Sequence, residues 1–128
     1  MHPATHLPHP QQRKRILIVD DEQETTRLLR IILERKRPYE VRVENDSKRA
    51  LDVTRAFRPD VVLLDIIMPD LDGGDVAALI RNEPSLSKMP IIFLSACAQP
   101  IAGYPFLSKP SPVEKVIECI EESLKRAT

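Results

Sequence analysis

Short apolar runs alternate with amphipathic stretches from Arg15 onward, and this alternation constrains the fold more than any other feature of the sequence. It is typical of a parallel sheet that carries helices on both faces. Five runs are predicted to be strands: Ile16 to Val19, Tyr39 to Val43, Val61 to Leu64, Ile91 to Leu94, and Phe106 to Leu107. The second run alternates apolar and polar residues, which predicts a strand at the edge of the sheet.

Four stretches between and after these runs carry apolar residues at helical spacing. Helices are predicted over Thr25 to Lys36, around Ala50 to Phe57, around Val76 to Ile80, and after Ser111. The last helix has the clearest start, with Ser111 at the N-cap, Pro112 at N1 and Glu114 at N3. The predicted fold class is therefore α/β.

The connection between the fourth and fifth runs differs from the others. It has only ten residues, Ala96 to Pro105, and contains two prolines and a glycine. A parallel crossover normally takes a dozen or more residues and usually a helix. We therefore expect the fourth helix to be missing or degenerate, and we expect the thinned face of the sheet to expose Ile92, Leu94 or Phe106.

The chain has 128 residues, which suits one domain over residues 15–128. Residues 1–14 are expected to form a disordered tail, because they contain little that could offset their ordering entropy. Metal binding by His2, His6 and His9 is the less favoured interpretation, since these residues are irregularly spaced among prolines.

Charge and hydropathy exclude several classes of protein. Nineteen basic residues balance nineteen acidic ones, so no global field would draw the chain to nucleic acid or membrane. No apolar run approaches the ~20 residues needed to span a bilayer. Cys97 and Cys119 are interpreted as reduced thiols. We expect a cytoplasmic protein that binds neither membrane nor nucleic acid.

Polar residues whose side chains could bind a ligand or react follow four of the five predicted strands. They are Asp20 and Asp21 after the first, Asp65 after the third, Ser95 after the fourth, and Lys109 after the fifth. In open doubly wound sheets, ligands bind outside the carboxyl ends of the strands. Asp21 and Glu24 could instead form a helix capping box, although that interpretation leaves the other residues unexplained.

Three carboxylates in one crevice repel one another unless a cation neutralises them. Magnesium fits, because it takes one or two carboxylates together with phosphate oxygens and water. Phosphorylation of Asp65 would add about one negative charge between the metal ion and Lys109. Asp65 is the candidate nucleophile because it ends a continuous apolar strand, and Asp20 and Asp21 are candidate metal holders.

At this point the sequence resembles the response-regulator receiver domains of two-component signalling. The resemblance covers the chain from Ile16 to its end and rests on four motifs. These motifs are ILIVDDE at 16–22, DIIMPDLDG at 65–73, LSA at 94–96 and FLSKP at 106–110. The resemblance implies a flavodoxin-like, doubly wound sheet of five parallel strands in the order 2-1-3-4-5.

The resemblance also implies a phosphorylation site with Mg²⁺ as cofactor. A histidine kinase or phosphotransfer protein would phosphorylate Asp65. Asp21, Asp65 and the backbone carbonyl of Ile67 would hold Mg²⁺, and Asp20 would act mainly through a coordinated water. The domain would be no enzyme beyond its own phosphorylation and dephosphorylation. A pseudo-receiver that binds partners without being phosphorylated is the alternative.

Further roles follow from the same resemblance. Ser95 and Lys109 would contact the phosphoryl group, while Ser95 and Phe106 would switch a protein-interaction surface. That surface would meet a downstream protein or a second copy of the chain. Phe106 could also be a plain core aromatic. Ile67 and Cys97 cannot readily position a hydrolytic water, which predicts a long-lived phosphorylated state and argues against a phosphatase that uses paired aspartates.

Overall fold

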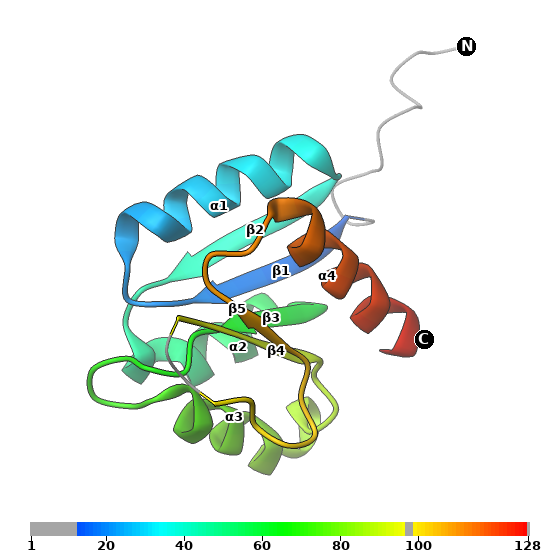
Figure 1. Cartoon of the computed structure of the whole chain (residues 1–128). Coiled ribbons are helices and arrows are strands. Elements are labelled where there is room, and N and C mark those ends of the chain that lie inside the picture. Colours follow the sequence, from blue (N-terminus) through cyan, green and yellow to red (C-terminus); the bar gives the residue numbers. More distant parts are fainter. Residues whose placement is uncertain (1–12, 97–98, 128) are drawn as a thin grey trace.

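The computed structural model describes residues 13–96 and 99–127 (Figure 1). Strand β1 (Lys14–Val19) begins at the last residue of the expected tail. The predictions for residues 1–12, including the three histidines, and for Cys97 lie outside the described residues. Cys119 is a free thiol.

Five parallel strands form one sheet in the order β2-β1-β3-β4-β5, as predicted. The strands after β1 are β2 (Tyr39–Glu44), β3 (Val61–Leu64), β4 (Ile91–Ser95) and β5 (Phe106–Ser108). Every residue of β3 and β4 is buried, which explains their continuous apolar sequences. The alternating strand β2 does lie at an edge.

Helices cover both faces of the sheet (Figure 1). They are α1 (Gln23–Lys36), α2 (Ala50–Phe57), α3 (Gly73–Asn82) and α4 (Val113–Ala127), with short 3₁₀ segments η3 (Ser47–Arg49) and η4 (Pro84–Leu86). Side chains such as Leu33 and Ile117 pack with Ile18 in the core under α1 and α4. Val53 and Ile80 pack with Leu17 in the core under α2 and α3. Neighbouring strand residues thus serve opposite cores.

The predicted cap of the last helix is wrong by one residue. Helix α4 begins at Val113, and the Pro112 carbonyl accepts the first helical hydrogen bonds, from the amides of Lys115 and Val116. The Ser111 hydroxyl instead donates to the Ser108 carbonyl. Pro112 therefore takes the N-cap position, which the sequence signal assigned to its neighbour.

The described residues of the β4–β5 connection, Ala96 and 99–105, contain a turn and no helix. Tyr104 covers the sheet in place of a helix: its ring meets Phe93 edge to face, with centroids 5.0 Å apart. The Arg81 guanidinium lies 5.2 Å from the centroid of the Tyr104 ring. The sequence predicted no helix here, and a single aromatic side chain, that of Tyr104, packs on the sheet instead.

The expected exposure of the thinned face is wrong for two residues. Ile92 and Leu94 are buried. Ile92 packs into the core under α1 and α4, which is the face opposite Phe93. Phe106 is partly buried and packs against the core under α2 and α3. Alternate residues of a strand face opposite sides of the sheet, so Ile92 lies on the side covered by α1 and α4 and not on the side without a helix.

Within the described residues, no helix is both long and apolar enough to cross a membrane.

Candidate functional site

Three acidic residues from two strand ends come together as predicted. Carboxylate oxygens of Asp20, Asp21 and Asp65 all lie within 4.8 Å of one another. The sheet ladder fixes two of them: the Asp20 amide donates to the Glu44 carbonyl at 3.1 Å and the Asp65 amide to the Val19 carbonyl at 2.9 Å. The backbone of Asp20 and of Asp65 is therefore held by hydrogen bonds to neighbouring strands.

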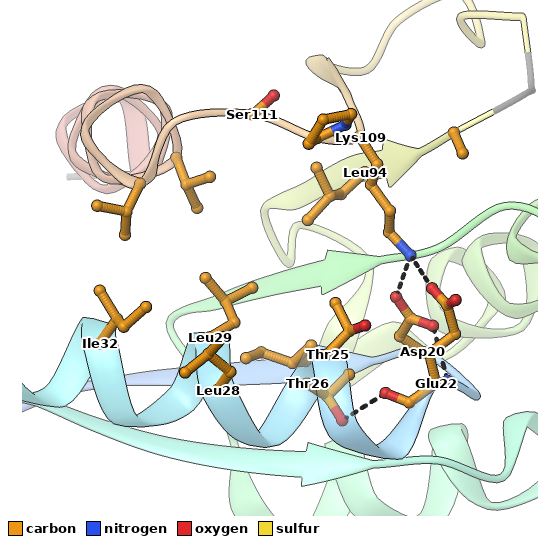
Figure 2. Close-up of a pocket in the computed structure, with 15 residues that line it drawn as sticks. Asp20, Glu22, Thr25, Thr26, Leu28, Leu29, Ile32, Leu94, Lys109 and Ser111 are labelled. Atoms are coloured by element: carbon orange, nitrogen blue, oxygen red, sulfur yellow. Dashed lines mark hydrogen bonds and ion pairs between the residues drawn. The ribbon is translucent and has the colours of Figure 1, made fainter.

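Lys109 brings a positive charge to this cluster. Its Nζ forms an ion pair with Asp20 and lies 3.6 Å from Oδ2 of Asp65 and 3.1 Å from Oε1 of Glu22. The Lys109 side chain is only 15% exposed, and its amide donates to the Ser95 carbonyl at 3.0 Å. Figure 2 shows the ammonium group reaching down from the strand end to Asp20 and Glu22.

Burial and mutual contact shift the pKa values of Asp20 and Lys109. Burial raises the pKa of Asp20, and the charge of Asp65 adds to the rise, while Lys109 and the Glu22 amide act against it. Burial alone would lower the pKa of Lys109, but its hydrogen bonds to Asp20 and Glu22 raise the pKa overall. The lysine therefore stays charged, and its ammonium group contacts three carboxylates, those of Asp20, Glu22 and Asp65.

The donor set fits a hard divalent cation. All three clustered residues offer carboxylate oxygens, which magnesium prefers, and they leave an excess of negative charge for it to neutralise. Asp20 and Asp65 are buried, whereas Asp21 is exposed. A cation bound between them would thus have protein oxygens on one side and water on the other, as magnesium usually does in proteins.

The capping alternative for Asp21 is wrong. Helix α1 begins at Gln23, and its N-cap residue, Glu22, makes no side-chain cap hydrogen bond. Asp20 stabilises the turn before α1 instead, because its Oδ1 accepts a 3.0 Å hydrogen bond from the Glu22 amide. Asp21 is therefore not part of a capping box.

Ser95 lies on β4, the neighbour of β3, and Phe106 lies on β5, the edge strand beyond β4. Ser95 ends β4, is buried, and lies opposite Ser108 in the β4–β5 register. Phe106 lies opposite Phe93 in the same register. Ser95 is thus adjacent in the backbone to Lys109, while the proposed switching of Phe106 stays a prediction.

The loop from Asp65 to Gly73 demands a glycine at its end. The Gly73 amide donates to the Ile66 carbonyl at 2.7 Å, and a Cβ at position 73 would lie 2.4 Å from the Asp65 carbonyl oxygen. Asp72 and Asp75 form a capping box that starts α3 directly behind this contact. Ile67, whose carbonyl was predicted to bind the metal ion, has a side chain that is largely exposed.

The sequence analysis missed three residues around the site. Glu22 contacts Lys109, Asn45 donates to the Asp20 carbonyl at 2.7 Å, and Ser47 hydrogen-bonds to the loop after β3. Glu22 was visible as the third acid of the run that begins at Asp20. Asn45 directly follows β2, so the search for polar residues after strands would have found it if extended to the edge strand.

A groove of about 680 Å³ borders the acidic cluster. It lies between α1 and the segment that leads from Lys109 into α4, as Figure 2 shows. Its lining is mainly apolar, with Leu28 and Leu29 on one side and Val113 on the other, and Asp20 and Lys109 lie in its wall. Leu28 is largely exposed on this surface.

Comparison with known proteins gives consistent matches. A family model described as the response regulator receiver domain matches residues 16–121. The nisin biosynthesis regulatory protein NisR of Lactococcus lactis is 35% identical over 120 residues, which cover 88% of this chain and 51% of NisR. The DNA-binding response regulator MtrA of Mycolicibacterium smegmatis is 39% identical over 84 residues, covering 66% of this chain and 35% of MtrA. The chain spans about half or less of these relatives.

Solved structures agree on the fold. A putative response regulator from Chloroflexus aurantiacus has a TM-score of 0.81 at 25% identity, covering 89% of this chain and 99% of that one. A CheY-like response regulator receiver domain protein from Methanospirillum hungatei also has a TM-score of 0.81, at 26% identity, covering 90% and 96% respectively.

Proposed function

The chain belongs to the response-regulator receiver domain family, and from that premise we propose that Asp65 accepts a phosphoryl group in the presence of Mg²⁺. Receiver domains of this family are signalling domains of two-component systems and not classical enzymes. The phosphoryl donor would be a histidine kinase or a phosphotransfer protein.

In the proposed reaction a carboxylate oxygen of Asp65 attacks phosphorus. A new O–P bond forms, the bond from phosphorus to the donor breaks, and its electron pair leaves with the donor. Lys109, whose Nζ lies 3.6 Å from the Asp65 carboxylate, would pair with the added negative charge. Bound Mg²⁺ would supply further positive charge at the transferring oxygens. Asp21, Asp65 and the Ile67 carbonyl would hold the ion, with Asp20 acting through water.

The observation that carries this proposal is the approach of a partly buried lysine, Lys109, to the buried carboxylate of Asp65 inside an acidic cluster. A domain that only binds partners has no need for this arrangement, because buried charges are costly. The test is to incubate the protein with Mg²⁺ and acetyl phosphate and to measure its intact mass. We expect a gain of one phosphoryl group that is absent in Asp65→Asn and absent without Mg²⁺. An unchanged mass would favour the pseudo-receiver alternative.

The groove beside the site supports a protein donor. It exposes Leu28 next to Asp20 and Lys109, so an apolar helix that carries a phosphohistidine could pack there while its imidazole reaches Asp65. Leu28→Glu should therefore slow transfer from a phosphorylated donor protein and leave labelling by acetyl phosphate unchanged. Equal slowing with both donors would contradict this docking.

For the output we propose a switch through Ser95 and Phe106 that alters binding to a downstream protein or to a second copy of the chain. MtrA is a DNA-binding protein, but this chain covers only 35% of its length. We propose that residues 15–128 themselves bind no nucleic acid, because the DNA-binding activity of a relative such as MtrA can lie in the part of that protein that this chain does not match.

A further inference from the structure

We propose that the first four residues after β2, residues 45–48, position the acidic site without contributing a ligand to it. We call these residues the brace. The proposal rests on the function proposed above, because it concerns how the loops are held for Mg²⁺. The brace follows the edge strand, and its side chains reach both of the loops that carry the three clustered carboxylates.

Asn45 holds the first loop. Its side-chain amide donates to the Asp20 carbonyl at 2.7 Å and to the Thr26 hydroxyl at 3.1 Å. Thr26 is buried in α1, and its hydroxyl donates to the Glu22 carbonyl at 3.0 Å (Figure 2). One amide therefore links the end of β1 to the start of α1, and Asp21 lies between these two fixed points.

Ser47 holds the second loop. Its hydroxyl donates to the Pro69 carbonyl at 2.8 Å and accepts a hydrogen bond from the Leu71 amide at 3.1 Å. Ser47 is 4% exposed, so water does not readily replace it. The residue between its two partners, Asp70, has a φ of 69°, in the left-handed region. The hydroxyl thus fixes a turn that is unfavourable for a side-chain-bearing residue.

The contribution of Lys48 is smaller. Its Nζ lies 3.9 Å from Oδ2 of Asp70, and both side chains are more than half exposed. Exposed ion pairs of this kind contribute little. Among the described residues, the two side-chain hydrogen bonds that reach residues 67–71 from outside the loop are both made by Ser47.

These contacts matter because magnesium demands near-octahedral ligands at ~2.0–2.1 Å. The loop begins at Asp65 and includes the Ile67 carbonyl. Greater mobility of residues 69–71 would therefore make the positions of these two ligand oxygens less well defined. Loss of groups that orient metal ligands typically weakens metal binding about 10–100-fold. We therefore expect Ser47→Ala and Asn45→Ala each to weaken Mg²⁺ binding about tenfold.

The experiment is a calorimetric titration of the unphosphorylated protein with Mg²⁺, run on the wild type, Ser47→Ala, Asn45→Ala and Ser47→Thr. Ser87→Ala is the matched control, because it also removes a hydroxyl bonded to a proline carbonyl, that of Pro84, away from the site. Ser47→Thr keeps the hydroxyl and should retain most of the affinity. The labelling rate of the alanine variants should fall at low Mg²⁺ and recover at saturating Mg²⁺.

Unchanged Mg²⁺ affinity in folded Ser47→Ala and Asn45→Ala would overturn the proposal. So would a labelling rate that stays low at saturating Mg²⁺, since that outcome places the defect in the chemistry. Should the variants fail to fold, amide hydrogen exchange of the wild type tests the proposal instead. The Leu71 amide should be protected from exchange, and fast exchange of this amide would overturn the proposal. Failure of the wild type itself to bind Mg²⁺ or to be labelled would instead refute the proposed function.

Discussion

The centre of the sheet and its β4–β5 edge are stabilised in different ways. Around β1 and β3, short polar contacts fix the backbone on each side of the acids: Asn45 reaches the Asp20 carbonyl and Gly73 the Ile66 carbonyl. At the β4–β5 edge, a turn and the ring of Tyr104 cover Phe93 where a helix would normally lie. Directional hydrogen bonds thus define the chemical site at the central strands, while non-directional apolar packing covers the β4–β5 edge.

This difference bears on what each region can do. Hydrogen bonds hold atoms at fixed positions, which a metal and phosphoryl site requires. Packing of a single ring on a sheet covers less apolar area than a helix, so it can be displaced at lower cost. Mutations should therefore separate the two regions: changes near the acids should alter phosphorylation, and changes near Tyr104 should alter stability and leave phosphorylation intact.

The largest effect is expected from Lys109→Ala. The variant loses the ammonium group that contacts Asp20 and Asp65. Removal of one preorganised electrostatic partner costs about 10²–10³ in rate. We expect the rate of labelling by acetyl phosphate, followed by intact mass, to fall by at least the lower of these factors.

The matched control is Lys115→Ala, which removes an exposed lysine from the first turn of α4. It should label like the wild type. A Lys109→Ala protein that labels at the wild-type rate would mean that the lysine serves only to neutralise the acids.

The next effect is that of Gly73→Ala. The added Cβ would lie 2.4 Å from the Asp65 carbonyl oxygen and 2.7 Å from the Ile66 Cα, so backbone must move. Overpacking of this kind costs about 1–3 kcal/mol. We expect a loss of about 2 kcal/mol in the free energy of unfolding, measured by urea denaturation, together with slower labelling.

Gly74→Ala is the matched control on the next residue. Its Cβ would have only the Asp72 side chain nearby, at 3.2 Å. Alanine is favoured over glycine inside a helix by about 0.8–1.0 kcal/mol, so this variant should be as stable as the wild type or more stable. Equal behaviour of the two alanine variants would show that the close approach to Asp65 is unimportant.

Tyr104→Ala tests the other region. The ring packs on Phe93 and under the Arg81 guanidinium. Because Tyr104 is only partly buried, we expect a loss of about 1–2 kcal/mol, less than for a fully buried aromatic residue. Tyr104→Phe should be close to wild type, since it keeps the ring. The labelling rate should not change in either variant, and a large loss of labelling in Tyr104→Ala would show that the two regions are coupled.

The sequence predicted the regular parts of this molecule well. The strands and the meeting of Asp20, Asp21 and Asp65 followed from apolar runs and their polar ends, and the lack of a helix in the described part of the β4–β5 connection followed from its short, proline-containing sequence. These features depend on short periods along the chain, which are visible without coordinates. The strand order, in contrast, was predicted from the family resemblance.

Other features depend on contacts between distant residues, and the sequence carries no local signal for them. Ser47 and Pro69 are 22 residues apart, and nothing near either one indicates that they meet. The exposure of Ile92 was predicted wrongly, because assigning its face required knowing which helices cover which core. The role of Tyr104 likewise depends on a ring contact across the sheet.

The smallest expected effect concerns the lifetime of the phosphorylated state. Ile67 lies two residues after Asp65, and its side chain is 58% exposed. An apolar side chain at this position offers no hydrogen bond to a hydrolytic water, so the phosphoryl group should be lost slowly. We expect a lifetime at neutral pH well beyond seconds, followed by intact mass after removal of acetyl phosphate. Ile67→Asn should shorten it several-fold, whereas Ile67→Val, which stays apolar, should not. A wild-type lifetime of seconds would mean that water reaches the phosphoryl group by a route that Ile67 does not control.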